Sequence, residues 1–358
     1  MEKEVVVGML CGIVMGVAFE KSRVLEPEEI RSQMSMKSFI MMKIFLSAVA
    51  ASSASLLVLS LVAPSRVAKC REGVSGATKS KEAGIVGGLL LGAGITISGA
   101  CCPGIVLAQV GSGKARSLVT FVGCLAGALA HSVVEPAYRK AWPKMADRKA
   151  ARLMGSWRVA VTISTAICAV AVYAIEKAVP WRAEAERALG RPLGPEKGQL
   201  FFTAAAWRPQ TAGALIGGLQ VPLVGLISQT LGTSSAYVTL VGTVVDPTRP
   251  GRADLRAKVG QYWQVALVSG VSLGAFLSSK ASGLFLFDRG AVGLGAAFFG
   301  GALLVFGARV AGGCTSENGI SGVSCLSETA FYAVGAMFAG AVATRLFLSS
   351  FLRTASHL

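Results

Sequence analysis

The stretch Gly87–Cys101 reads GGLLLGAGITISGAC, and the stretch Gly300–Cys314 reads GGALLVFGARVAGGC. Each is a glycine-rich apolar run that ends in a cysteine. An internal repeat of this kind decides the fold before any single element is considered, and here it predicts two similar halves. Aligned without a gap, four glycines and the final cysteine coincide: Gly87 with Gly300, Gly88 with Gly301, Gly94 with Gly307, Gly99 with Gly312, and Cys101 with Cys314.

The composition indicates an integral membrane protein. Of the 358 residues, 53% are hydrophobic and 15% are charged, and the mean hydropathy is +0.60. An average soluble domain has about 25% charged residues. The 43 glycines fit this class, because glycine lets membrane helices approach closely where no hydrophobic effect draws them together. A soluble enzyme domain with so little surface charge is excluded.

Apolar runs separated by polar connectors predict an all-α, polytopic fold. A helix needs about 20 apolar residues to cross a bilayer. The first run shows no cleavage site, so we expect an uncleaved first helix. Two of the runs, 84–110 and 291–313, are interrupted or ended by turn residues. The runs lie at residues 5–20, 39–63, 84–110, 117–134, 157–179, 211–231, 236–245, 262–279, 291–313 and 329–350.

Short broken segments at corresponding places in two halves are typical of a transport site between inverted repeats. We therefore expect a first repeat at residues 1–135 and a second at 211–358, with their broken helices converging at mid-membrane. Residues 136–210 would form a basic connector with one extra helix, at 157–179. A weaker echo upstream pairs two further glycines of each half: Gly8 with Gly213 and Gly12 with Gly217.

The net charge of +16 is concentrated in short connectors. The loops at residues 64–83 and 135–158 are rich in lysine and arginine, which predicts that both lie on the cytoplasmic side if the membrane is the plasma membrane. An organelle membrane is the alternative. Nucleic-acid binding is excluded, because no aromatic residues interleave with these short basic stretches.

Residues 98–104, SGACCPG, form the first candidate site. Pro103 disfavours helix in the residue before it but suits the first turn of a new one, so we expect a helix to end here and another to restart. The N–H groups of residues 104–106 would then point back at Cys101 and Cys102 and attract an anion. Irregular backbone inside a membrane is tolerated only when it is buried in protein or lines a cavity.

Residues 312–319, GGCTSENG, form the second candidate site. A glycine-rich apolar helix again runs into a cysteine. Thr315, Ser316 and Asn318 are suitable caps for a new helix, which we expect at residues 320–325. Each half therefore offers a thiol at a helix break beside hydroxyl or amide groups.

The other chemistry-bearing residues are less specific. Arg309 lies inside an apolar helix, where an ionisable residue marks a functional site or a structural partner, here of backbone carbonyls or Glu317. Cys11 and Cys325 are open between packing and function, since a buried thiol is often a small hydrophobe. With eight cysteines, no CxxC pair and two histidines, we expect no metal, no cofactor and no disulfide framework. Three cysteines are assigned to packing or regarded as incidental: Cys124, Cys168 and Cys70.

The two motifs resemble those of a known family. The segment from Gly94 through Cys102-Pro103-Gly104 to Gly113 resembles the Cys-Pro-Gly segment of the YeeE/YedE sulfur-transport family. The segment from Gly307 through Cys314-Thr315-Ser316 to Gly322 is similar to that family's second signature. The resemblance covers both halves but not residues 136–210.

This resemblance implies a membrane transporter, not an enzyme, that takes up thiosulfate past cysteines contacting the sulfur atom. Cys314 matches the second signature, whereas two candidates fit the first. Spacing from Gly99 favours Cys101, as the internal repeat does, and spacing to Pro103 favours Cys102; we expect Cys101 to be the functional thiol, with Cys102 as the alternative. Cys11 matches only loosely. The substrate-binding residues expected are Cys101, Cys102, Cys314, Cys11, Gly104, Thr315, Ser316 and Arg309.

Two alternatives stay open at this point. The first is that the same scaffold carries another sulfur or selenium species, because Glu317-Asn318-Gly319 stands where the family often has Gly-His-Gly. The second is a membrane thiol-redox enzyme or sulfur-relay partner, although neither a CxxC pair nor a cofactor motif supports it. The expected partners are a small sulfur anion, membrane lipid and a soluble sulfur-carrier protein.

Overall fold

The computed structural model describes residues 2–75, 80–142, 156–190, 192–193, 204, 206–246, 248, 252–283, 285 and 292–355. Helices are the only regular secondary structure in these ranges. Six helical stretches are long and apolar enough to cross a membrane, and a bent pair near the C-terminus makes a seventh. The prediction of an all-α, polytopic membrane protein is therefore confirmed.

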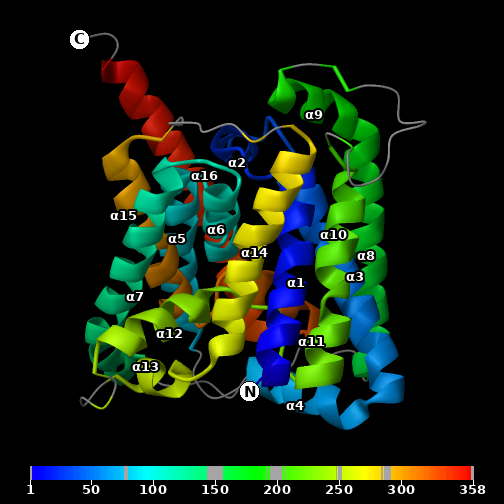
Figure 1. Ribbon diagram of the computed structural model, residues 1–358, viewed down its shortest axis with the longest axis vertical. Helices are drawn as coiled ribbons and strands as arrows, with labels where there is room; N and C mark the ends of the chain where they lie inside the picture. Colours follow the sequence, from blue (N-terminus) through cyan, green and yellow to red (C-terminus); the bar gives the residue numbers. More distant parts are fainter. Residues whose placement is uncertain are drawn as a thin grey trace.

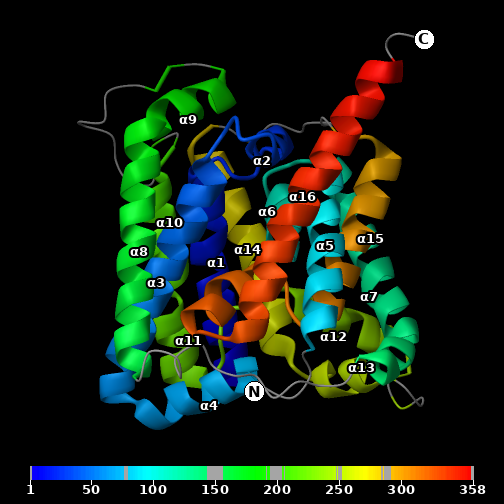
Figure 2. The ribbon, with the colours of Figure 1, turned by 180° about the vertical axis from the view of Figure 1, so that it is seen from behind.

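The helices can be grouped by the two halves of the sequence and the connector between them (Figures 1 and 2). The first half contains α1 (Glu2–Lys21), α2 (Pro27–Met34), α3 (Ile40–Val62), α4 (Pro64–Ser75), α5 (Lys81–Ser98), α6 (Pro103–Gly111) and α7 (Arg116–Ala141). The connector contains α8 (Trp157–Ala178) and α9 (Trp181–Leu189). The second half contains α10 (Pro209–Gly218), α11 (Gln220–Ile227), α12 (Ser234–Val244), α13 (Ala253–Lys258), α14 (Tyr262–Ala281), α15 (Leu294–Val310), the π-helix η2 (Thr315–Gly322) and α16 (Glu328–Ala355).

The repeated glycines place α5 and α15 in direct backbone contact. A Cβ on Gly94 would lie 2.4 Å from the backbone nitrogen of Leu304, and a Cβ on Gly307 would lie 2.3 Å from that of Leu91. Gly94 and Gly307 are equivalent in the repeat, and so are Leu91 and Leu304. The two contacts are therefore the same contact, made once from each half. Gly87, earlier in α5, faces Ala311, the residue that follows the end of α15. The two equivalent helices therefore run antiparallel, as inverted repeats require.

The outer contacts recur at the same offset. Gly88 of α5 meets Ala333 of α16, and its counterpart Gly301 of α15 meets Thr120 of α7. Each of the two central helices thus carries an equivalent neighbour, so the same packing is made in both halves.

The weaker upstream echo also corresponds to a repeated contact. A Cβ on Gly12 would lie 2.0 Å from the carbonyl oxygen of Leu267 in α14, and a Cβ on Gly217 would lie 2.3 Å from that of Ala48 in α3. Glycine is required at both places because any side chain would enter the neighbouring backbone. The pairs α1–α14 and α10–α3 are therefore equivalent.

Both central helices end in a reversal, as the motifs predict. Gly99 caps α5 in the left-handed conformation (φ 68°), and Gly312 follows α15 in the same conformation (φ 70°). The chain then turns back beside the helix that it has just left, since the Gln109 side chain of α6 donates to the carbonyl of Gly99 at 2.9 Å. Figure 2 shows α6 in the upper part of the bundle and η2 in the lower part.

The second new helix differs from the expectation. It begins at Thr315, not near Ile320, and its N-cap residue is Cys314. Thr315 and Asn318 do not cap it, because their side chains donate to the carbonyls of Cys101 and Gly313. These hydrogen bonds tie the start of η2 to the other half and to the preceding reversal.

The basic segments lie together at one end of the bundle. Figure 1 places α4 and the C-terminal end of α7 at the bottom, and Lys69 and Arg139 line one cavity there. Both described parts of the basic loops therefore share a side, as predicted. Several basic residues of these loops lie outside the described residues: Lys79, Lys144, Arg148, Lys149 and Arg152.

The connector contains the expected extra helix as α8, which packs against α3. It also contains α9, in a stretch for which only polar sequence was expected. The buried Lys43 of α3 holds both helices through Glu176 at 3.0 Å and Glu184 at 2.7 Å. Residues 194–203 of the connector lie outside the described residues, and the domain boundaries at 135 and 210 stay a prediction.

Candidate functional site

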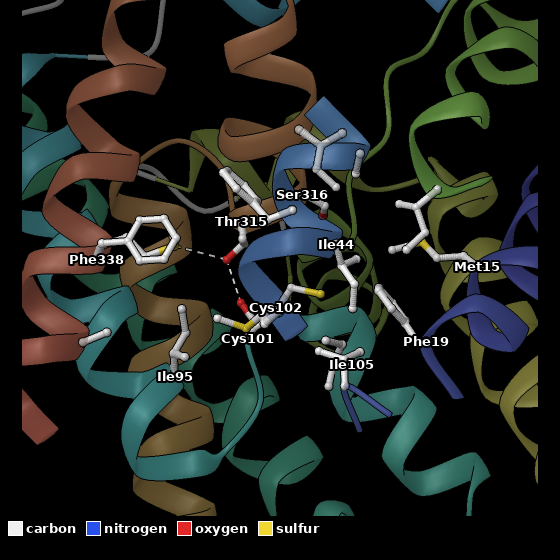
Figure 3. Close-up of a pocket in the computed structure, with 18 of the residues that line it drawn as sticks. Met15, Phe19, Ile44, Ile95, Cys101, Cys102, Ile105, Thr315, Ser316 and Phe338 are labelled. Carbon is white, nitrogen blue, oxygen red and sulfur yellow. Dashed lines mark hydrogen bonds between the residues drawn. The ribbon is translucent and has the colours of Figure 1, made fainter. Parts of the chain in front are cut away.

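Three of the predicted cysteines meet where the two reversals approach each other. Cys102 is the N-cap residue of α6, and Cys314 is the N-cap residue of η2. Cys101 stands directly before Cys102 in the first reversal. Its carbonyl accepts a hydrogen bond of 2.6 Å from the Thr315 hydroxyl. All three side chains are buried. Figure 3 shows Cys101 and Cys102 directly beside Thr315, with Ser316 close by.

Thr233 joins the two cysteine sites. Its hydroxyl lies 3.5 Å from the Cys314 sulfur and 3.3 Å from the Ser316 hydroxyl. It also lies beside Cys102, and its methyl group faces Gly104, where a Cβ would come within 3.0 Å. Thr233 stands just before α12, far from both motifs in sequence, so no spacing rule pointed to it. The polar run of residues 233–235 between apolar stretches was the one available signal.

The start of α6 presents backbone donors to this site. Pro103 stands in its first turn, and the Cys102 side chain makes no capping hydrogen bond there. The Cys102 sulfur lies close to the amides of Gly104 and Ile105. Helix N-termini carry partial positive charge and bind anions through such N–H groups. The first site therefore combines soft sulfur groups with donors that suit an oxyanion.

A small apolar cavity adjoins Cys101 and Cys102. Its volume is about 50 Å³, and Figure 3 shows side chains from both halves around it. Thioether sulfur is polarisable and adapts to irregular ligands, and the Thr315 hydroxyl lies 3.3 Å from the sulfur of Met337. The residues that define this apolar cavity include Met15, Phe19, Met34, Met41, Ile44, Ile105, Met337 and Phe338, with Cys101, Cys102, Thr315 and Ser316.

A larger polar cavity opens at the basic end of the bundle. We call this cavity of about 800 Å³ the vestibule. Its described lining carries four cations and three acids, so basic groups are available to an anion in a wall of mixed charge. The residues that define it include Lys69, Cys70, Glu72, His131, Arg139, Gly232, Ser235, Asp254, Lys258, Arg309 and Glu317.

Arg309 reaches the vestibule, but its charge is largely engaged. Its Nε and Nη2 atoms donate to the two carboxylate oxygens of Asp254 at 2.9 and 2.6 Å. Burial raises the pKa of Asp254, yet Arg309 outweighs it and leaves that pKa below its ordinary value. Asp254 is thus a fixed counter-ion, and a bidentate pair of this kind is strong. No motif or spacing indicates this pairing, because the partners are far apart along the chain.

Cys11 stands apart from the other predicted site residues. It is buried on α1, one and two turns from Met15 and Phe19. Spacings of four residues share a helix face, so Cys11 points along the face that borders the apolar cavity without lining it. Cys124 is buried in the main core, and Cys168 in a smaller cluster with Val49. No disulfide links the eight cysteines, all of which lie in the described ranges.

The predicted site residues therefore fall into three groups. Cys101, Cys102, Gly104, Cys314, Thr315 and Ser316 are brought together around Thr233. Arg309 lies one layer away, towards the vestibule, where Asp254, Ser234, Ser235 and Glu317 surround it. Cys11 borders the assembly from α1.

Comparison with known proteins identifies the family. A family model described as sulphur transport matches residues 21–343. The match includes the connector at 136–210, which the motif resemblance did not cover, and it leaves Cys11 outside. No curated protein matches the chain. With both motifs inside the matched region, the chain belongs to the sulphur transport family, a family of membrane transporters to which the YeeE/YedE proteins belong.

Proposed function

We propose that the protein takes up thiosulfate, or a closely related sulfur anion, along a path lined by Cys102, Cys101 and Cys314. The observation that carries this proposal is the meeting of two re-entrant helices, each with a cysteine at its N-cap, across Thr233. One helix comes from each half, so the site lies between the repeats, where transporters of this architecture bind their substrates.

The chemistry of the site suits a small anion with one soft sulfur atom. A thiol is a weak donor and a weak acceptor, so Cys102 and Cys314 would hold the terminal sulfur without trapping it. The backbone amide of Gly104 and the hydroxyls of Thr233 and Ser316 would hold the oxygens. Weak contacts at successive sites allow an ion both to enter and to leave, as conduction requires.

The difference between the two cavities supports one direction for the proposed path. The apolar cavity borders Cys101 and Cys102, and the vestibule lies beyond Cys314 at the basic end. Basic connectors are retained on the cytoplasmic side of the plasma membrane. In that membrane the anion would enter through the apolar cavity, pass the cysteines and leave through the vestibule. Arg309, held by Asp254, would act on the anion at this last stage.

Uptake of radiolabelled thiosulfate into liposomes that contain the purified protein tests the proposal. We expect saturable uptake that empty liposomes lack, and growth of a sulfate-uptake-deficient host on thiosulfate as its sole sulfur source. Unlabelled sulfide and selenium oxyanions, added as competitors, distinguish thiosulfate from the alternative solutes. Stronger inhibition of labelled uptake by one of these than by unlabelled thiosulfate would reassign the substrate, and thiol oxidation without transport would favour a redox enzyme.

A further inference from the structure

The side chain of Glu317 stands in the wall of the vestibule next to Cys314. This carboxylate lies on η2, three residues after Cys314, and its side chain is 17% exposed. It accepts hydrogen bonds from the Cys314 amide at 3.0 Å, the Ser234 hydroxyl at 2.5 Å and the Ser235 hydroxyl at 3.2 Å. Three donors from two different helices therefore converge on one partly buried acid.

Arg309 completes this donor set from the opposite side. Its Nη1 atom donates to Ser234 and Ser235 at 3.1 and 3.2 Å and lies 3.9 Å from the Glu317 carboxylate. The other nitrogens of the guanidinium are occupied by Asp254, so one face of the cation is directed to Glu317. A backbone amide, two hydroxyls and a guanidinium face are the groups that bind the oxygens of a sulfur oxyanion.

The position of Glu317 separates the vestibule from the cysteines. Glu317, Gly232, Ser235 and Arg309 all line the vestibule, whereas Cys314 is not among the described residues that line it. The Glu317 side chain crosses directly over Gly232, where a Cβ would lie 2.4 Å from its Cγ atom. An anion at Cys314 therefore meets the Glu317 carboxylate before it reaches the vestibule.

We propose that Glu317 is a tethered anion that occupies an oxyanion-binding site between Cys314 and the vestibule, and that a sulfur oxyanion must displace its carboxylate to pass. The inference rests on the proposed function for the identity of that oxyanion. Two anions cannot share the site, because like charges in close contact repel each other strongly. The displaced carboxylate has room in the vestibule, where Lys258 and Arg139 lie.

Thiol labelling tests this gate without relying on thiosulfate transport. The purified protein in detergent is treated with 2-sulfonatoethyl methanethiosulfonate, which is anionic, or with methyl methanethiosulfonate, which is neutral. Peptide mass spectrometry then follows Cys314 alone. For Glu317→Gln, which keeps an acceptor for the Cys314 amide, we expect labelling of Cys314 by the anionic reagent to accelerate about tenfold. Labelling by the neutral reagent should accelerate clearly less, because it gains only from the easier ionisation of the thiol once the carboxylate charge is gone.

Two further variants serve as controls. Glu28→Gln removes an acid on α2 that is 62% exposed and is not among the described residues that line the vestibule, and it should leave both rates at the wild-type value. Glu317→Asp keeps the charge, so it should retain the slow reaction with the anionic reagent even if the shorter side chain loosens the helix start.

Equal acceleration of both reagents in Glu317→Gln would overturn the proposal, because Glu317 would then be only a helix cap whose loss opens the structure. Unchanged rates for both reagents would overturn it as well. Charge-selective acceleration in a protein that takes up no thiosulfate would support the gate and reject thiosulfate as the substrate. The failure of one proposal is therefore separable from the failure of the other.

Discussion

The two re-entrant segments have the same backbone arrangement but lie in different surroundings. Helix α6 starts with Pro103, Gly104 and Ile105 and leaves its first amides beside the apolar cavity. Helix η2 starts with Thr315, Ser316 and Glu317, and its acid takes up the Cys314 amide beside the vestibule. The repeat therefore dictates where the chain reverses, while a few side chains distinguish the proposed anion site of one half from the proposed gate of the other.

The comparison also shows why two cysteines of the first half are candidates for the equivalent of Cys314. Gly99 and Gly312 both adopt the left-handed conformation at the reversal, but the next helix begins one residue later in the first half. Counted from the glycine, Cys101 corresponds to Cys314. Counted from the helix start, Cys102 does. Because the N-cap position sets how a side chain faces the helix amides, we favour Cys102 as the functional equivalent of Cys314.

The largest effect is expected from replacing these two thiols. Serine keeps the approximate volume but substitutes a hard, hydrated hydroxyl for a soft sulfur. Cys102→Ser and Cys314→Ser should each lower thiosulfate uptake about tenfold or more, with unchanged amounts of folded protein. Cys124→Ala and Cys168→Ala, in packing positions, should stay near the wild-type rate. Uptake into liposomes, normalised to protein, is the measurement.

Cys101→Ser decides between the two ways of counting. If Cys102 is the equivalent of Cys314, Cys101→Ser should retain more activity than Cys102→Ser. The reverse order would show that the distance from Gly99 matters more than the helix start. Undiminished uptake in the triple variant of Cys101, Cys102 and Cys314 to serine would contradict the thiol path altogether.

The second effect concerns the symmetry of the two halves. Gly94→Ala and Gly307→Ala each place a Cβ within 2.5 Å of a backbone nitrogen in the partner helix. Overpacking of this kind costs about 1–3 kcal/mol of unfolding free energy, and the cost should be nearly equal in the two variants. Gly335→Ala, with no described atom within 4 Å of the new Cβ, should not destabilise. Thermal unfolding in detergent compares all three, and a large difference between the first two would argue against equivalent packing.

The repeated backbone packing is well predicted from the sequence, because a close contact between two helices requires glycine, and the glycines can be read from the sequence. Gly87, Gly94, Gly300 and Gly307 align in the repeat and are the residues at which α5 and α15 touch. The reversals are also predictable, because Pro103 and the left-handed glycines are local signals.

The side chains that link the halves are not predictable in this way. Thr233 reaches Cys314 across 81 positions of the chain, and Asp254 reaches Arg309 across 55. Neither residue belongs to a motif or a periodic pattern, because its role depends only on where the folded chain brings it. For Arg309, the sequence suggests Glu317 as an ionic partner, whereas the close bidentate partner is Asp254.

The third effect tests the residue that both sites share. Thr233→Val keeps the shape of the side chain but removes the hydroxyl that faces Cys314 and Ser316. One hydrogen bond of this kind contributes about 0.5–1.5 kcal/mol, so uptake should fall about twofold to tenfold. Thr162→Val, on α8, removes a hydroxyl that bonds only within its own helix and should be neutral. Uptake equal to that of wild type in Thr233→Val would remove Thr233 from the path.

The smallest effect separates the two cavities by charge. The vestibule contains Lys258 and other cations, whereas the described lining of the cavity at Cys101 is apolar and carries no charged residue. Lys258→Gln should therefore raise the KM for anion movement from the vestibule side about twofold at low salt, and the difference should vanish near 0.5 M salt, where the Debye length is only a few ångströms. Lys177→Gln, at the end of α8, should have no effect.

Transport measured in both directions across liposomes of known orientation checks this prediction. Movement that starts at the apolar cavity should show the weaker salt dependence. Equal salt dependence in the two directions would mean that the vestibule cations do not attract the anion, and the asymmetry between the halves would then lie in Glu317 alone.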